Sequence, residues 1–196
     1  MKKIEEKIEH MDQYDYVDDS YAVKVEDKYA PYIGVFLMRF SALEHSLNIC
    51  IANRLGDDWH STGYMILERL TISNKIHLFA KLYSELLSFQ GKKGKEKLRL
   101  IVNILEDLNK FRNYIVHANW TTLDKEHYVR TRIEIDNDVG QVNFKKIKIT
   151  KSVINQNINS IIKTIDLMEE FSEKALGFGF EEKTHKIYPP KKNNHL

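Results

Sequence analysis

Apolar side chains return at helical spacing through most of this 196-residue chain, and this repetition restricts its fold more than any other feature. The first pattern begins at Pro31 and ends near Leu55, before the letters GDD. Its apolar stripe consists of Ile33, Phe36, Leu37, Phe40, Leu43, Leu47 and Ile51. Similar patterns follow in residues 61–70, from about Ser73, and in about residues 95–117. Such spacing places side chains on one face of a helix, so we expect a bundle of helices.

Between residues 120 and 149 the period changes from helical to alternating. The stretches HYVRTRIEI and QVNFKKIKI are separated by DNDVG, and WTTL precedes them. Alternation of this kind is typical of strands, so we expect a β-hairpin or a three-stranded antiparallel ribbon. A last amphipathic helix is predicted over residues 151–176, ended by Gly177. The predicted fold is mainly α: a helical bundle with a small antiparallel β-ribbon inserted before the last long helix.

The pattern predicts a single domain. The length suits one core, and we find neither an internal repeat nor a linker rich in Gly, Pro or Ser. Residues 1–30 are acidic in their second half and lack a clear period, so we expect an N-terminal arm or a short helix there. Residues 31–177 form the predicted domain. Residues 178–196 contain little to bury and are expected to form a flexible tail.

Composition excludes several classes of protein. The formal net charge is only +2, so any nucleic-acid site must come from a local patch. The single cysteine, Cys50, has no partner for an intrachain disulfide and is expected to be a core thiol. The histidines lack zinc-binding spacing, and no phosphate loop is present, so we predict no metal and no cofactor. We find no signal peptide and no uninterrupted apolar run of about 20 residues, so a cytoplasmic protein without a membrane contact is expected.

The segment NKFRNYIVHANW, residues 109–120, places a charge on an apolar helix face. At 100° per residue, Arg112 falls within the stripe of its own helix, and Glu44 falls within the stripe of the helix predicted to begin at Pro31. A buried guanidinium requires a partner, so the two stripes predict that Glu44 lies near Arg112. Two interpretations remain open: a structural salt bridge in the core, or an arginine held for function.

The same segment resembles a known family. FRNYIVHANW is similar to the motif of an arginine, a polar residue, three further residues and a histidine at the end of the last core helix of HEPN-domain proteins, and FSALEHSLN resembles their acidic element. The resemblance covers residues 31–118 and 152–176. It implies a helical bundle that forms a homodimer, with two motifs facing one site, and a metal-independent ribonuclease activity in toxin–antitoxin or antiphage defence systems. By this resemblance Arg112 and His117 are the catalytic pair, Asn113 is the polar residue beside the arginine, and Glu44 is the orienting carboxylate.

The ribbon supplies candidate RNA contacts. Trp120, Arg130, Arg132, Lys145, Lys146 and Lys148 all fall on the predicted strands. The basic residues form either a track for phosphates or solvated charges that keep the strand edges from pairing with other molecules. Trp120 either stacks on a base or caps the bundle.

Two functions are compatible with these residues. The first is an HEPN-type endoribonuclease, because RNA carries its own 2′-hydroxyl nucleophile and needs only a group that moves protons and a fixed cation. Histidine and arginine are such groups. Its expected partners are RNA, a second copy of the chain, and an antitoxin or another defence component. The alternative is a non-catalytic module on the same scaffold that binds a nucleotide, RNA or a protein.

Overall fold

The computed structural model describes residues 19–55, 62–87, 92–117, 119–122, 128–136 and 141–177. Within these ranges the elements in chain order are α1 (Asp19–Leu55), α2 (Thr62–Glu68), α3 (Ile72–Leu86), α4 (Lys92–Val116), β1 (Asn119–Thr122), β2 (Tyr128–Asp136), β3 (Gln141–Ile149) and α5 (Lys151–Leu176). The predicted mainly α class is therefore confirmed. The strands form an antiparallel sheet in the order β1-β2-β3, inserted before the last helix.

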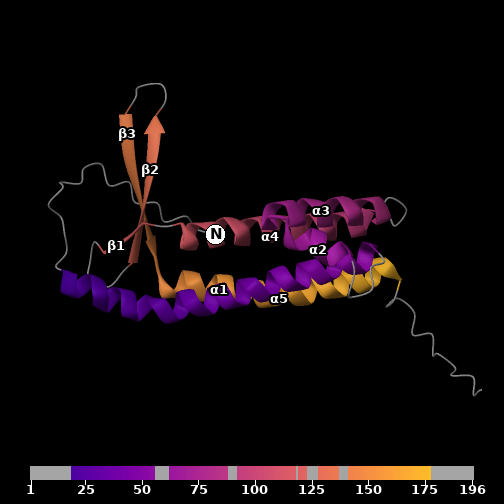
Figure 1. Ribbon diagram of the computed structural model, residues 1–196, viewed down its shortest axis with the longest axis horizontal. Helices are drawn as coiled ribbons and strands as arrows, with labels where there is room; N and C mark the ends of the chain where they lie inside the picture. The colour runs from indigo at the N-terminus through magenta and orange to yellow at the C-terminus, as the bar shows by residue number, and fades with distance from the viewer. Residues whose placement is uncertain are drawn as a thin grey trace, which may run out of the picture.

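The long helices run along one axis, with α1 beside α5 and α3 beside α4 (Figure 1). Ser46 of α1 donates a hydrogen bond to Glu169 of α5 at 3.0 Å, and Lys151 at the start of α5 lies 4.7 Å from the ring centroid of Tyr32. Both contacts advance in the same direction along the two helices, so α1 and α5 are parallel. The sheet lies at the end of the bundle where α4 ends and α5 begins.

One cluster of buried side chains joins the four long helices, α1, α3, α4 and α5. At its centre Tyr83 of α3 donates a hydrogen bond to the carbonyl of Cys50 at 3.1 Å and shares another with Ser172 of α5. Burial raises the pKa of Tyr83 to about 12 and that of the Cys50 thiol to about 11. The prediction that Cys50 is a core thiol is confirmed.

The beginning of α1 corrects the predicted boundary at Pro31. The helix starts at Asp19, so part of the expected N-terminal arm is helical and Pro31 lies inside the helix. The reason is burial, because Val25 and Tyr29 continue the stripe of Phe36 at helical spacing and both are buried. This packing outweighs the loss of one backbone donor at the proline. Residues 1–18 of the predicted arm, and the predicted tail from 178 to 196, lie outside the described residues.

The other helix ends agree with local sequence signals. Thr71 caps α3 by accepting a hydrogen bond from the backbone N–H of Asn74, and Thr150 caps α5 in the same way with Val153. Gly177 ends α5 with φ of 81°, in the left-handed region that favours glycine. The predicted end of the last helix is confirmed.

One property of α1 differs from the reading of the sequence. The stretch Val23–Leu55 is long and apolar enough to cross a membrane by length and composition, and 44% of its most apolar window is buried inside the bundle. The core helix of a soluble protein and a signal sequence both meet the same criterion.

Candidate functional site at the end of α4

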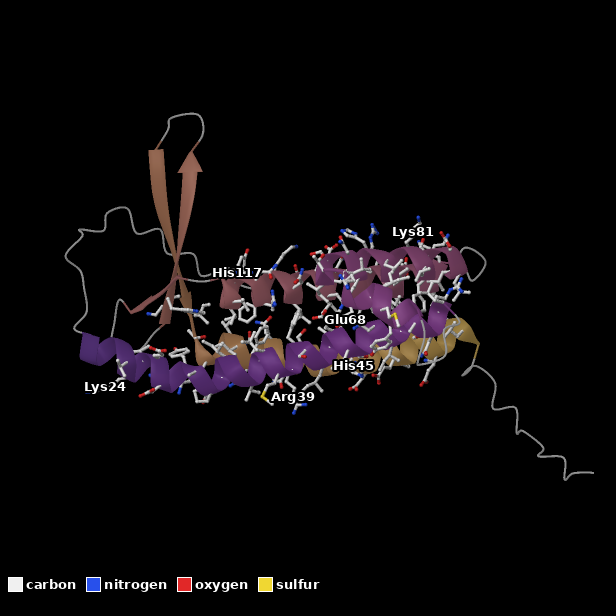
Figure 2. All side chains as sticks on the ribbon, in the orientation of Figure 1. Lys24, Arg39, His45, Glu68, Lys81 and His117 are labelled. Atoms are coloured by element: carbon white, nitrogen blue, oxygen red, sulfur yellow. The ribbon has the colours of Figure 1, made fainter. Side chains whose placement is uncertain are left out.

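Arg112, Asn113 and His117 occupy the last turns of α4 and the residue that follows it. Figure 2 shows His117 at the end of α4 that lies next to the sheet. The Arg112 guanidinium donates a hydrogen bond from Nη1 to Oδ1 of Asn113 at 3.1 Å, and the backbone N–H of His117 donates to the carbonyl of Asn113 at 3.1 Å. Asn113 therefore contacts both residues of the predicted catalytic pair, one through its side chain and the other through its backbone.

The neighbouring helix explains how an arginine is tolerated on an apolar face. On α4, Leu105 and Leu108 are buried, whereas Arg112 is only half-buried although it lies in the same direction around the helix. The buried Asn109 donates to Ser73 Oγ at 3.0 Å, and α3 begins at Ile72. The last turns of α4 thus extend beyond α3, as Figure 1 also shows. Arg112 lies on the core face where that face is no longer covered by α3.

The predicted contact between Glu44 and Arg112 is wrong. Oε1 of Glu44 lies 2.5 Å from Nζ of Lys75 on α3. The register between α1 and α4 gives the reason: the ring of Phe36 meets that of Phe111 edge-on at 5.1 Å, and Glu44 lies eight residues beyond Phe36. That is about 12 Å along the helix axis, whereas Arg112 is adjacent to Phe111.

Lys75 is the residue that sequence reasoning missed. It is buried on the face of α3 that also carries Ile76, Phe79 and Tyr83. A charged residue on an apolar stripe was the signal that identified Glu44 and Arg112, and the same criterion applied to residues 72–86 identifies Lys75. Glu44, Lys75 and Arg112 all meet this criterion, and only the structure shows which two form the pair.

The two basic residues of the candidate site have no carboxylate partner among the described residues. In the described part of the chain, neither Arg112 nor His117 forms an ion pair with a carboxylate, and His117 is exposed. Two large side chains beside them are also exposed, Tyr114 to 37% and Val116 to 43%. A cation, an exposed imidazole and these exposed side chains thus occur on the last turns of α4, with Arg112 and His117 about 140° apart around an ideal helix.

The register of the sheet places the predicted RNA contacts on its two opposite faces. Arg132 pairs with Lys145, which places the two at opposed positions on one face, whereas Lys146 pairs with Thr131 and Lys148 with Val129 on the other. Arg130 pairs with both Trp120 and Ile147. The side chains of Arg130, Arg132, Lys145 and Lys146 lie outside the described part. Trp120 and Lys148 are half-buried, and Trp120 packs against the core.

A metal site was not predicted, and the described ranges contain no group of three or more His, Cys, Asp or Glu side chains placed to hold a metal ion. His45 is exposed, and its Nδ1 lies 3.1 Å from the hydroxyl of Tyr64.

Comparison with family models, with curated proteins and with solved structures returned no match to this chain.

Proposed function

We propose that this protein is a metal-independent endoribonuclease of the HEPN type that acts in a toxin–antitoxin or antiphage defence system in the cytoplasm. One observation carries the proposal: Arg112, half-buried and without an ion-pair partner in the described residues, lies five residues before an exposed His117 on the last turns of α4. Arginines on an apolar face are normally paired, because an isolated guanidinium loses hydration on burial. An arginine left for a ligand instead offers its charge to a phosphate.

The proposed reaction needs no group beyond those of the protein and the RNA. One imidazole removes the proton of the 2′-hydroxyl, whose oxygen attacks the adjacent phosphorus, and the 5′-oxygen leaves with a proton from an acid. Arg112 stabilises the charge that develops on the phosphoryl oxygens. Asn113 positions Arg112 through the hydrogen bond between their side chains. The products are a 2′,3′-cyclic phosphate and a 5′-hydroxyl.

A homodimer would supply the base and the acid from two chains. A single His117 cannot hold both protonation states at once, whereas two copies facing one substrate divide the roles. The exposed side chains of Tyr114 and Val116 beside His117 are an apolar surface suited to such a contact. Both residues lie on turns of α4 that extend past Ile72, where α3 begins.

Cleavage of single-stranded RNA in excess EDTA tests the proposal. Wild type should produce cyclic phosphate ends, and DNA of the same sequence should remain intact because it lacks the 2′-hydroxyl. His117→Ala and Arg112→Ala should each lower the rate by about 100-fold or more. The matched controls are His77→Ala and Arg99→Ala, since both residues are exposed and lie on α3 and α4 away from the site.

Cleavage of DNA, or equal losses in the control variants, would refute the assignment. Binding of RNA by the wild type without cleavage, retained in His117→Ala, would support the alternative of a non-catalytic module on this scaffold. Toxicity on expression in bacteria, relieved by His117→Ala, would support the defence role and the search for an antitoxin.

A further inference from the structure

The side of α1 that faces away from α4 is exposed along several turns. Phe36 of α1 meets Phe111 of α4 edge-on, and Met38 lies about 160° from Phe36 around an ideal helix. Met38 is 74% exposed and Val35 is 45% exposed. Between residues 27 and 45, the positions within about 60° of Met38 are Asp27, Pro31, Gly34, Val35, Met38, Ser41, Ala42 and His45, which we call the outer stripe. All of them are exposed except Gly34, which is half-buried.

The glycine of the outer stripe has no explanation within the chain. Gly34 lies near the middle of α1, where glycine destabilises a helix relative to alanine. A Cβ at this position would meet no atom of the described residues within 4 Å, apart from its chain neighbours and the surrounding backbone of α1. Packing inside the chain therefore does not require a glycine here. On an exposed helix face, a glycine allows another molecule to approach the backbone closely.

The outer stripe is complementary to itself when two copies of α1 lie antiparallel. Gly34 and Met38 lie two residues on either side of Phe36, and Asp27 and His45 lie nine residues on either side of it. A two-fold axis at the level of Phe36 places Met38 of one chain against the partner's Gly34, and Asp27 against the partner's His45. A long apolar side chain thus meets a position without a side chain, and an acidic residue meets an imidazole at each end.

The contact that His45 makes within its own chain suits this arrangement. Nδ1 of His45 lies 3.1 Å from the hydroxyl of Tyr64. When this hydroxyl donates to Nδ1, a neutral imidazole carries its hydrogen on Nε2 and can donate from there to a carboxylate. A protonated imidazole adds the attraction between opposite charges. Both forms of His45 are therefore suitable partners for Asp27.

We propose that the outer stripe is a weak self-association surface, on which α1 of a second copy lies antiparallel with the two-fold axis near Phe36. A single helix face offers a small area, and interfaces below about 1,200 Å² are typical of transient contacts, so we expect a Kd on the order of 100 µM. The contact is separate from the one proposed at the end of α4, since Figure 2 shows His45 on α1 and His117 at the end of α4. It does not depend on the nuclease activity, and at low micromolar concentration it is largely unpopulated.

Sedimentation equilibrium of the full-length Val116→Asp protein tests the proposal. This substitution removes the contact proposed at the end of α4 and leaves the outer stripe unchanged, so the outcome is the same whether or not the α4 dimer exists. The protein should show a monomer–dimer equilibrium between about 10 µM and 1 mM. Absence of self-association up to about 1 mM would overturn a second copy as the occupant of the outer stripe.

A pair of methionine variants in the same background tests the apolar contact. Met38→Lys should weaken self-association at least about tenfold, because it removes the side chain that lies against the partner's Gly34. Met65→Lys is the matched control, since Met65 is 69% exposed but belongs to α2, and it should change the Kd by less than about twofold. Equal effects of the two substitutions would show that the contact is not on the outer stripe.

Gly34→Leu distinguishes a specific contact from general adhesion of apolar surfaces. The fold should accept the new side chain, because a Cβ at Gly34 has open space around it, and circular dichroism checks this. The leucine occupies the space of the partner's Met38, so self-association should weaken at least about tenfold although the protein gains apolar surface. Asn53→Leu adds the same side chain at another exposed position of α1 and should not weaken the contact. Stronger self-association of Gly34→Leu would refute the close approach at this glycine.

An exchange of charges tests the antiparallel register. Asp27→Arg should weaken self-association about threefold, because the arginine then faces the partner's His45. The double variant Asp27→Arg/His45→Asp should restore the contact, because each arginine now faces an aspartate of the other chain. Failure of the double variant to regain affinity would contradict the two-fold axis near Phe36.

Discussion

Removing either partner of the ion pair between Glu44 and Lys75 should lower the stability of the protein by a different amount. The side chain of Lys75 is 5% exposed and that of Glu44 is 36% exposed, with 2.5 Å between Nζ and Oε1. Removing the carboxylate leaves an ammonium group buried without its counter-charge. Removing the ammonium group instead leaves a carboxylate that water already reaches. The two truncations should therefore differ in cost, although they remove the same contact.

The burial of each partner sets the expected magnitudes. Glu44→Ala should lower the free energy of unfolding by about 3–5 kcal/mol, the usual cost of leaving a buried charge unpaired. Lys75→Met should cost only about 0–1 kcal/mol, because methionine fills the apolar stripe while the carboxylate hydrates. Glu44→Gln keeps an acceptor oxygen for Lys75 and should fall between the two, at about 1–3 kcal/mol. A loss of 3–5 kcal/mol is a large part of the stability of a typical domain.

Urea denaturation followed by far-UV circular dichroism measures these differences. Glu96→Ala is the control, because its pair with Lys92 spans 3.7 Å between side chains that are 63% and 89% exposed, and its loss should cost less than about 0.5 kcal/mol. The double variant Glu44→Ala/Lys75→Met should be more stable than Glu44→Ala alone. Lys75→Met being the more destabilising single change, or additive costs in the double variant, would refute the argument from burial.

Three further predictions concern the ends of α4 and α5 and the core. Replacement of Val116 by Asp should convert the proposed dimer to a monomer and lower RNA cleavage, whereas His117→Ala should stay dimeric but be inactive. Light scattering measures the oligomeric state, and the cleavage assay measures the activity. A monomeric wild type would contradict the composite site. Burial raises the pKa of Cys50 from 9.0 to about 11 and that of Tyr83 from 10.0 to about 12, so the stability present below pH 9.0 should fall as the pH rises toward 12. Tyr83→Phe should reduce this loss of stability above pH 10.0. Urea midpoints measured across this pH range test the prediction, and an unchanged pH dependence in Tyr83→Phe would be contrary evidence. Gly177→Ala should cost about 1 kcal/mol because alanine is strained at a φ of 81°, and a thermal melt showing no change would argue against this cap.

Helix and strand positions were largely determined by the sequence itself. The stripes predicted α3, α4 and α5 to within about three residues, and alternation predicted the ribbon. Local interactions explain this success, because a cap such as Thr71 or a left-handed Gly177 acts within a few residues of its position. The exception is the start of α1, where Val25 and Tyr29 are buried. Tertiary burial thus outweighed the local signal at Pro31.

In the candidate site, too, some features could be predicted from the sequence and others only from the tertiary structure. Arg112, Asn113 and His117 were recognisable because their spacing and their place at a helix end are properties of one segment. The partner of Glu44 was not, because pairing depends on how far each helix is displaced along its neighbours. That displacement brings Lys75 into contact with Glu44, and it means that α3 covers α4 only as far as about Asn109. Only tertiary packing therefore decides that Arg112 remains half-buried and available, since periodicity specifies the face of a helix but not the length over which another helix covers it.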